Sequence, residues 1–550
     1  MRARRYIQDL LQEAVRARGL DWPAKASLDR PKDETYGDLA SNLALVLAKQ
    51  AGMNPRQLAA ELREGLLESG TACAEVEVAG PGFLNVFMKP AFWQQTVQEV
   101  LSGQESYGAL ELGQSEPVLV EYVSANPTGP LHIGHGRGAA VGDSLARILR
   151  FAGYQVTTEY YVNDAGRQMQ LLGRSIWVRY QQRAGRQAVL PQECYQGGYI
   201  ASLAEELWIE HGPELLDRPE NEAEALCRDL GLKRILAGIQ EDLERFRVEH
   251  TVWRPESDLV QGRQVERTLV SLQQDDLAYE SGGALWFCSS RFGDDKDRVL
   301  RKSDGELTYF ASDIAYHAEK LARGFSLLID VWGADHHGYV PRMKAAMQAL
   351  GREPESLRVI LIQLVNLVRG GEYVSMSTRA GEFETLADVC SEVGVDAARF
   401  IFLTRKSDSA LDFDLDLLKQ QSMDNPVYYV QYAHARICSM LRKARERGVA
   451  ADPDPESDLS YLSTREDLEL LKAMDSFPDI VASAATTLSP HHVSYFLQDL
   501  AGMLHRYYNK HQVLGAEAEC RQARIQLMHS VSRVLKNGLT LLGVQAPERM

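Results

Sequence analysis

The sequence predicts an α/β protein in three units: an α+β unit over 1–110, a nucleotide-binding α/β domain over 111–390 and an all-helical bundle over 391–550. Three observations support this division. Over 117–147 a strand pattern leads into a Gly/His turn and a long amphipathic helix, as at the start of a nucleotide-binding domain. Strand and helix patterns alternate again after residue 306, and from 391 onward the apolar periodicity is helical.

The N-terminal unit combines helices with short strands. Helical patterns cover 3–18, 38–51 and 55–68, and strand patterns follow at 75–78 and 83–88. Such mixing over about a hundred residues is typical of a small α+β domain. Two roles are open to it, a stabilising appendage or a surface that touches RNA.

The central stretch carries the residues with the most chemistry. A strand at 118–123 is followed by the turn His132-Ile133-Gly134-His135-Gly136, and we expect the helix to start near Arg137. A helix start offers N–H groups and a positive dipole end to phosphate. Glycine allows a base or ribose close to the backbone, and imidazoles can donate to phosphate oxygens. The alternative is that any apolar strand can run into a glycine turn.

The domain is interrupted and then resumes. Helical patterns at 166–182, 198–211 and 221–247 predict a helical insertion at about 167–290. The strand at 326–332 ends in Gly333, Asp335 and His336. Because ligands bind at the carboxyl ends of strands in such sheets, we expect a site there.

Charge limits the ways in which the protein could hold nucleic acid. The net charge of −16 argues against binding by bulk electrostatics. Two helical stretches, 434–448 and 502–536, are locally basic, with tyrosines nearby. Aromatic rings beside cations suit unpaired RNA bases, although solvated basic faces and half-buried tyrosines are the common alternative. The candidate RNA contacts are Tyr428, Tyr432, Arg436, Tyr507 and Tyr508.

Composition also constrains location and metal content. No apolar run is long enough to span a bilayer, and the N-terminus has no secretory signal pattern. The seven cysteines are scattered and form no C-x-x-C pair, which supports neither a zinc site nor a disulfide framework. We therefore expect a cytoplasmic protein without a structural metal or a membrane partner, and we expect a monomer.

Several separated stretches resemble the bacterial arginyl-tRNA synthetases, in order and across nearly the whole chain. They are SANPTGPLHIGH, YYVNDAGRQM, TYFASDIAYH, VWGADHHGYVPRM, SMSTRAGEF, LDFDL, NPVYYVQYAHARI and RYYNKHQVL. The resemblance implies a Rossmann-type class I synthetase catalytic domain with an N-terminal domain that meets the tRNA elbow and C-terminal helices that bind the anticodon. It implies that L-arginine and ATP form arginyl-adenylate, that Mg²⁺ accompanies the ATP, and that the arginyl group passes to the 3′ end of tRNA-Arg.

The resemblance also implies roles for single residues. The arginine-binding positions are Glu121, Asn126, Tyr309 and Asp313. The ATP-binding positions are His132, Gly134, His135, Gly333, Asp335, His336, Met376 and Ser377, with His132 and His135 also catalytic. A guanidinium favours a rigid carboxylate and a hydroxyl acceptor, in agreement with this assignment. Asp313 could instead be an N-cap.

One signature departs from the family pattern. The loop that usually reads KMSKS is Ser375-Met376-Ser377-Thr378-Arg379, with hydroxyl residues at both lysine positions. Some arginyl enzymes carry a lysine before the HIGH motif, but this chain has Gly129 there. Arg379 is the candidate catalytic cation, and Arg369 and Lys302 are alternatives. Two other hypotheses are a non-enzymatic RNA-binding paralogue and a class I ligase for another amino acid.

Overall fold

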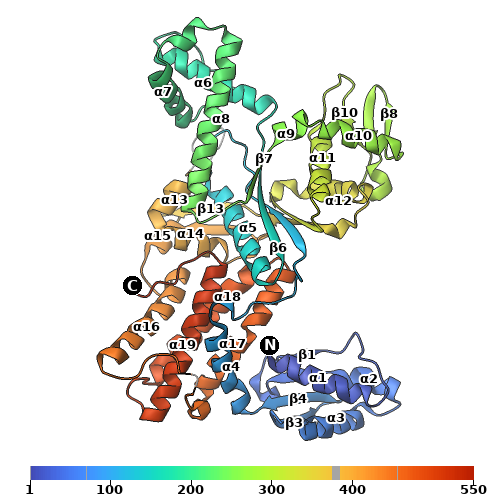
Figure 1. Ribbon diagram of the computed structural model, residues 1–550, viewed down its shortest axis with the longest axis vertical. Coiled ribbons are helices and arrows are strands. Elements are labelled where there is room, and N and C mark those ends of the chain that lie inside the picture. Colours follow the sequence, from blue (N-terminus) through green and yellow to red (C-terminus); the bar gives the residue numbers. More distant parts are fainter. Residues whose placement is uncertain (1, 70, 375–383, 455) are drawn as a thin grey trace.

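The computed structural model describes residues 2–69, 71–374, 384–454 and 456–550. A small N-terminal domain and a projecting group of helices lie at opposite ends of the molecule, and a parallel sheet and a helical bundle lie between them (Figure 1).

The N-terminal domain is a four-stranded antiparallel sheet with helices. The strand order is β1-β2-β4-β3. The strands are β1 (Leu28–Asp29), β2 (Leu39–Ser41), β3 (Cys73–Ala79) and β4 (Phe83–Met88), and the helices are α1 (Arg2–Arg16), α2 (Leu43–Ala51) and α3 (Pro55–Ser69). The helix expected over 38–51 starts only at Leu43, because residues 39–41 pair with β4 as a strand.

The catalytic sheet has five parallel strands in the order β12-β11-β5-β6-β7. They are β5 (Pro117–Glu121), β6 (Gln155–Val162), β7 (Val252–Pro255), β11 (Leu327–Gly333) and β12 (Leu357–Ile362), and α5 (Ile133–Phe151) connects β5 to β6. Val118, Leu119 and Val120 are fully buried, as is usual for a parallel strand covered on both faces. The chain turns to opposite sides at β5 and β11, so a ligand crevice is expected between their ends.

The expected insertion over about 167–290 is two structures rather than one. Helices α6 (Arg167–Arg183), α7 (Gly198–His211) and α8 (Glu220–Arg245) project from the sheet (Figure 1). β7 then returns to the sheet edge beside β6, so the helical insertion ends before residue 252. A four-residue strand in a polar stretch has too weak a pattern to be recognised without its partner strand.

A second lobe follows β7. It contains α9 (Glu256–Gln261), α10 (Gln264–Gln274) and an antiparallel sheet of β8 (Ala278–Ser281), β9 (Ala284–Phe287) and β10 (Arg298–Arg301). Helix α11 (Tyr309–Ala322) leads from this lobe to β11, and α12 (Val340–Ala349) leads on to β12. Thus α11 starts in the lobe and leads to the amino end of β11, whereas the polar residues lie at the carboxyl end of that strand.

The C-terminal bundle consists of α16 (Pro426–Glu446), α17 (Arg465–Thr486), α18 (His491–Lys510) and α19 (Ala518–Leu541). Between it and the catalytic sheet lie α13 (Leu386–Val393), α14 (Val395–Phe402), α15 (Leu415–Lys419) and a small sheet of β13 (Val365–Arg369), β14 (Glu372–Tyr373) and β15 (Leu411–Asp414). Because β15 pairs with β13, strand pairing crosses the division expected at residue 390.

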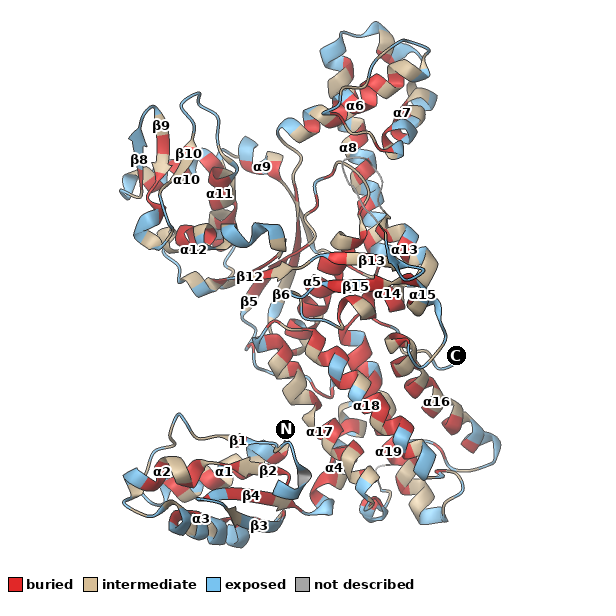
Figure 2. Ribbon diagram, turned by 180° about the vertical axis from the view of Figure 1, so that it is seen from behind, coloured by how far each residue is buried: buried red, intermediate tan, exposed pale blue. Residues whose placement is uncertain are grey.

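The bundle shares its core with the rest of the chain. Helix α4 (Pro90–Gly103) packs against α17 and α19, and Figure 2 shows buried residues along these helices. The Tyr107 hydroxyl donates to the Met474 carbonyl at 2.9 Å. One buried apolar cluster extends from α1 through α5 to α19. The C-terminal helices therefore form a continuous core with the catalytic sheet.

Arg399 on α14 joins three parts of this core. Its Nε donates to the Leu542 carbonyl at 3.0 Å, beyond the end of α19, and its Nη1 donates to the Phe246 carbonyl at 2.9 Å, at the end of α8. Its Nη2 pairs with Asp143 on α5. The fully buried guanidinium thus ties the insertion, the bundle and the helix after the Gly/His turn together.

Candidate active site

Helix α5 begins at Ile133 rather than near Arg137, because His132 caps it. The His132 Nδ1 accepts from the backbone N–H groups of Gly134 at 3.1 Å and His135 at 3.4 Å. The His132 N–H donates in return to Nδ1 of His135 at 3.3 Å. This reciprocal cap supplies partners for N–H groups that a helix start otherwise lacks.

The cap determines which ring nitrogens carry protons. Because both Nδ1 atoms accept hydrogen bonds, each neutral ring carries its proton on Nε2. Burial lowers the pKa of His132 and lowers that of His135 to about 3, so both rings are neutral near pH 7. The rings stack with their centroids 3.6 Å apart. The turn therefore presents two stacked imidazoles whose Nε2–H groups are the donors.

Two adjoining cavities lie where the sheet strands end. The inner one, of about 270 Å³, is lined by Glu121, Val123, Ser124, Tyr161, Asp313, Tyr316, His317, Asp330, Val331, Trp332, Gly333, His336, Tyr339 and Met343. The outer one, of about 460 Å³, is lined by Arg298, Val299, Thr308, Tyr309, Phe310, Asp313, His336, Tyr339 and Arg342. Asp313, His336 and Tyr339 belong to both walls. The carboxyl-end position agrees with the expectation from the strand pattern.

Asp313 stands between the two cavities. Its Oδ2 accepts a hydrogen bond from the Tyr339 hydroxyl. Burial raises the pKa of Asp313, and the bond from Tyr339 opposes that rise. Thr308 caps α11, with its Oγ1 accepting from Ala311 N at 3.4 Å, so the N-cap alternative for Asp313 is wrong.

The tyrosine that bonds Asp313 is Tyr339, which is not among the predicted arginine-binding residues. Tyr309 is 70% exposed and lines only the outer cavity, whereas Tyr339 reaches the carboxylate. Tyr339 stands in the stretch VWGADHHGYVPRM, close after β11, and its place at a strand end was the signal that could have identified it.

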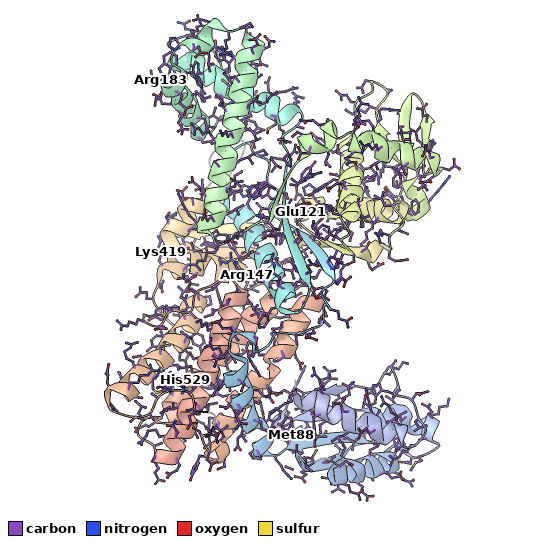
Figure 3. All side chains as sticks on the ribbon, in the orientation of Figure 1. Met88, Glu121, Arg147, Arg183, Lys419 and His529 are labelled. Atoms are coloured by element: carbon purple, nitrogen blue, oxygen red, sulfur yellow. The ribbon has the colours of Figure 1, made fainter. Side chains whose placement is uncertain are left out.

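Glu121 is the last residue of β5 and lies at the centre of the molecule (Figure 3). Its Oε1 accepts from Ser124 Oγ at 2.9 Å, and its Oε2 accepts from Lys320 Nζ at 2.5 Å. Val123 and Ser124 have φ of 70° and 38°, a left-handed kink that returns Ser124 to the strand end. Asn126 is exposed in the next loop and is not among the described residues that line either cavity.

The helical insertion covers the loop before the Gly/His turn. A Cβ on Gly129 would lie 2.9 Å from Cζ of Tyr199, which is on α7. Any side chain at this position, including a lysine, would require Tyr199 to move.

The other expected ATP positions lie around the same sheet edge. Gly333 ends β11, and Asp335 and His336 follow it directly. All three residues are exposed, and His336 Nε2 lies 3.5 Å from Asp335 Oδ2. Met376, Ser377 and Arg379 lie outside the described residues. The chain is described again from Glu384, and Thr385 forms a β-bridge with His132.

The two alternative cations are held in ion pairs. Arg369 Nη1 lies 2.7 Å from Glu392, and its Nη2 lies 3.3 Å from Glu384. Lys302 Nζ lies 2.8 Å from Glu306.

The candidate RNA contacts divide into two groups. Tyr428 and Tyr432 stack with their planes 6° apart, and the Arg436 guanidinium lies 4.3 Å from the centre of the Tyr508 ring. Tyr432, Arg436 and Tyr508 line a cavity of about 530 Å³. Tyr507 is fully buried and donates to Asp467 at 2.8 Å, so its prediction as an RNA contact is wrong. Its side chain fastens α18 to α17.

Within the described ranges no three His, Cys, Asp or Glu side chains gather as a metal site. The same part of the chain has no helix with the length and apolar character needed to cross a membrane.

Family models match the chain in three consecutive parts. They are the arginyl-tRNA synthetase N-terminal domain at 4–88, the class I (R) tRNA synthetase catalytic domain at 96–420 and the DALR anticodon-binding domain at 430–550. The catalytic model therefore extends past residue 390 and includes β15.

Relatives and solved structures agree with these models. The arginine–tRNA ligases of Solidesulfovibrio magneticus and Nitratidesulfovibrio vulgaris are 58% and 57% identical, over 100% of both chains in each case. An arginyl-tRNA synthetase structure from Campylobacter jejuni has a TM-score of 0.78 and 37% identity, covering 84% of this chain and 100% of its own. One from Thermus thermophilus has a TM-score of 0.77 and 25% identity, covering 100% of both. The capped histidine turn, the acidic cavity at the strand ends and these matches place the chain in the arginyl-tRNA synthetase family of class I aminoacyl-tRNA synthetases.

Proposed function

We propose that this arginine–tRNA ligase holds its amino acid in the inner cavity, activates it with ATP and transfers it to the 3′ end of tRNA-Arg. The observation that carries the proposal is the pair of carboxylates, Glu121 and Asp313, in the wall of one cavity at the carboxyl end of the sheet. A cavity with this wall suits a small cation with several hydrogen-bond donors, and arginine is such a ligand.

The geometry supports a division of roles. Asp313 is held by Tyr339 at the junction of the two cavities, where a long side chain could reach it. Glu121 is held by Ser124 and Lys320 at the strand end, and Tyr309 and Asn126 would close on the substrate from the exposed side. A site built around directed hydrogen bonds to a guanidinium can reject analogues lacking them by about 10⁴–10⁵-fold.

The phosphate end of ATP is assigned to the histidine turn. The Nε2–H groups of His132 and His135 are neutral donors at a helix start. The missing side chain of Gly134 makes room for the capping His132 ring, because a Cβ there would lie 2.9 Å from its Cε1. Gly333, Asp335 and His336 would face the adenosine. Mg²⁺ would be held mainly by the phosphates, as is usual for nucleotide-bound magnesium.

Arg379 is assigned to stabilise the leaving pyrophosphate. Met376 and Ser377, in the same loop, are assigned as ATP contacts. The bridge from Thr385 to His132 supports this assignment, because the chain beyond these residues is fastened to the histidine turn. The ion pairs of Arg369 and Lys302 also favour Arg379 over the alternatives.

The tRNA is assigned to the outer units. Tyr428, Tyr432, Arg436 and Tyr508 would stack on anticodon bases, and residues 1–110 would meet the tRNA elbow. Residues 111–390 would carry the catalytic chemistry and 391–550 anticodon recognition. The proposal places the enzyme in the cytoplasm as a monomer.

Amino-acid-dependent ATP–pyrophosphate exchange, run with and without tRNA, tests the proposal. Arginine should support exchange, and citrulline, its neutral isostere, should support only weak exchange. Exchange with another amino acid instead of arginine would make the protein a different ligase. RNA binding without any exchange, tRNA included, would make it a non-enzymatic paralogue.

A further inference from the structure

Three carboxylates form a row beneath the inner cavity. Asp330 on β11, Glu121 on β5 and Glu159 on β6 are register partners across adjacent parallel strands. Their side chains therefore point to the same face of the sheet. They are 1%, 8% and 0% exposed, so each ionised group needs a partner.

Helix α11 and its C-cap residue Arg323 supply those partners. Lys320 Nζ lies 2.5 Å from Glu121 Oε2 and 3.0 Å from Asp330 Oδ1. Arg323 binds both oxygens of Glu159, at 2.5 and 2.9 Å. Lys320 is the central member, because it joins two of the three acids and is itself fully buried.

His317 is a second partner of Asp330. Its Nε2 lies 3.0 Å from Asp330 Oδ2 and its Nδ1 lies 2.8 Å from the Asp313 carbonyl oxygen. The imidazole therefore links the outer acid of the row to the turn of α11 that carries Asp313. Lys320, Arg323 and His317 thus contact the three acids of the row, whereas Asp313 lies outside it and lines both cavities.

Lys320 touches neither open cavity, since the residues lining them do not include it. Of the two carboxylate oxygens of Glu121, Lys320 binds Oε2. The other oxygen, Oε1, accepts a hydrogen bond from Ser124, and both Ser124 and Glu121 line the inner cavity. We propose that Lys320 is a positioning residue for arginine recognition, holding Glu121 ionised from behind so that its other oxygen serves the substrate. The inference rests on the proposed function, because it assumes that Glu121 binds arginine.

Removing Lys320 should change the protonation of Glu121. Burial raises the pKa of Glu121, Lys320 opposes this, and Asp330 and Glu159 add to the rise. The groups facing Glu121 are Lys320, Tyr316, His317 and Asp313 on α11, Asp330 on β11, and Glu159 and Tyr161 on β6. Without Lys320 the carboxyl should take up a proton closer to neutral pH, and arginine use should then depend on pH.

The test uses Lys320→Met, Lys320→Arg and the double variant Lys320→Met/Asp330→Asn. The double variant is used if Lys320→Met does not fold. Replacing Asp330 as well avoids leaving its buried carboxylate without the lysine partner. Lys344→Met is the matched control, on α12 and half exposed. Arginine-dependent exchange is measured across pH 6–9 with tRNA and saturating ATP.

We expect Lys320→Met to lose about tenfold or more in kcat/KM for arginine at the acid end and to recover with rising pH. The double variant should lose less, because Asp330 then no longer raises the pKa of Glu121. KM for ATP should stay within about twofold, and Lys320→Arg should keep the parent's pH profile. In a Glu121→Gln background, Lys320→Met should have little further effect on arginine, because the lysine acts through Glu121.

Parent-like kcat/KM and pH dependence in Lys320→Met, or in the double variant if only that variant folds, would overturn the inference. A second contradicting outcome is a loss of kcat/KM in Lys320→Met that affects arginine and ATP alike, does not depend on pH and persists in the Glu121→Gln background. Such a loss would indicate a general structural role for Lys320. If the parent shows no exchange with arginine, the proposed function itself fails. If Glu121→Gln impairs arginine use and the Lys320 variants do not, only the role of Lys320 fails.

Discussion

Replacing Asp313 with asparagine removes one charge from the proposed guanidinium site and almost no volume. The asparagine carbonyl oxygen can still accept the hydrogen bond from Tyr339. Its amide then presents N–H donors where the carboxylate presented an acceptor. Because Thr308, not Asp313, caps α11, the helix should be unaffected. The perturbation is therefore confined to the contact with substrate.

The size of the effect follows from the burial of this carboxylate. A hydrogen bond to a charged group contributes about 1.5–3 kcal/mol, which corresponds to about 10-fold to 150-fold in kcat/KM for arginine. The upper part of this range is expected, because burial is the largest influence on the pKa of Asp313. Citrulline lacks the positive charge, so its weak activity should change much less.

The assay is ATP–pyrophosphate exchange with tRNA present, comparing arginine with citrulline. Asp304→Asn is the matched control, since Asp304 is exposed and its Oδ1 accepts from Glu306 N, a role that asparagine can retain. A kcat/KM for arginine within twofold of the parent, or an unchanged ratio of arginine to citrulline, would refute the role of Asp313.

Three further predictions concern other parts of the structure. Arg399→Met should lower the free energy of unfolding by about 3 kcal/mol, as measured by thermal unfolding. This is the low end for a broken buried ion pair, because Arg147 still pairs with Asp143. Arg379→Ala should slow adenylate formation by about 10²-fold in pre-steady-state assays with tRNA. An unchanged rate would mean that another cation stabilises the leaving pyrophosphate. Burial lowers the pKa of His135 from 6.5 to about 3, so stability should fall as pH drops below about 6.5, by at most about 1.4 kcal/mol per pH unit. The His135→Asn variant should lose less Tm than the parent between about pH 6.5 and pH 4.5, and equal losses would contradict this.

Local patterns were sufficient for most of the long elements. Helices α6, α7 and α8 fall close to their expected ranges, because apolar spacing along a helix needs no distant partner. The start of α5 was misjudged because the glycines after His132 are poor helix formers, whereas the reciprocal histidine cap stabilises the first turn. Strand β7 was missed since four residues become a strand only by pairing with β6.

The sequence by itself determined the family, the histidine turn and the polar residues at the strand ends, because these are runs of neighbouring residues with a recognisable order. Only the tertiary structure decided which of them meet. Tyr339 rather than Tyr309 bonds Asp313, and Tyr507 is buried in the bundle. The row of Asp330, Glu121 and Glu159 exists because strand register brings together residues that are far apart in the chain, and register is set by the packing of the whole sheet.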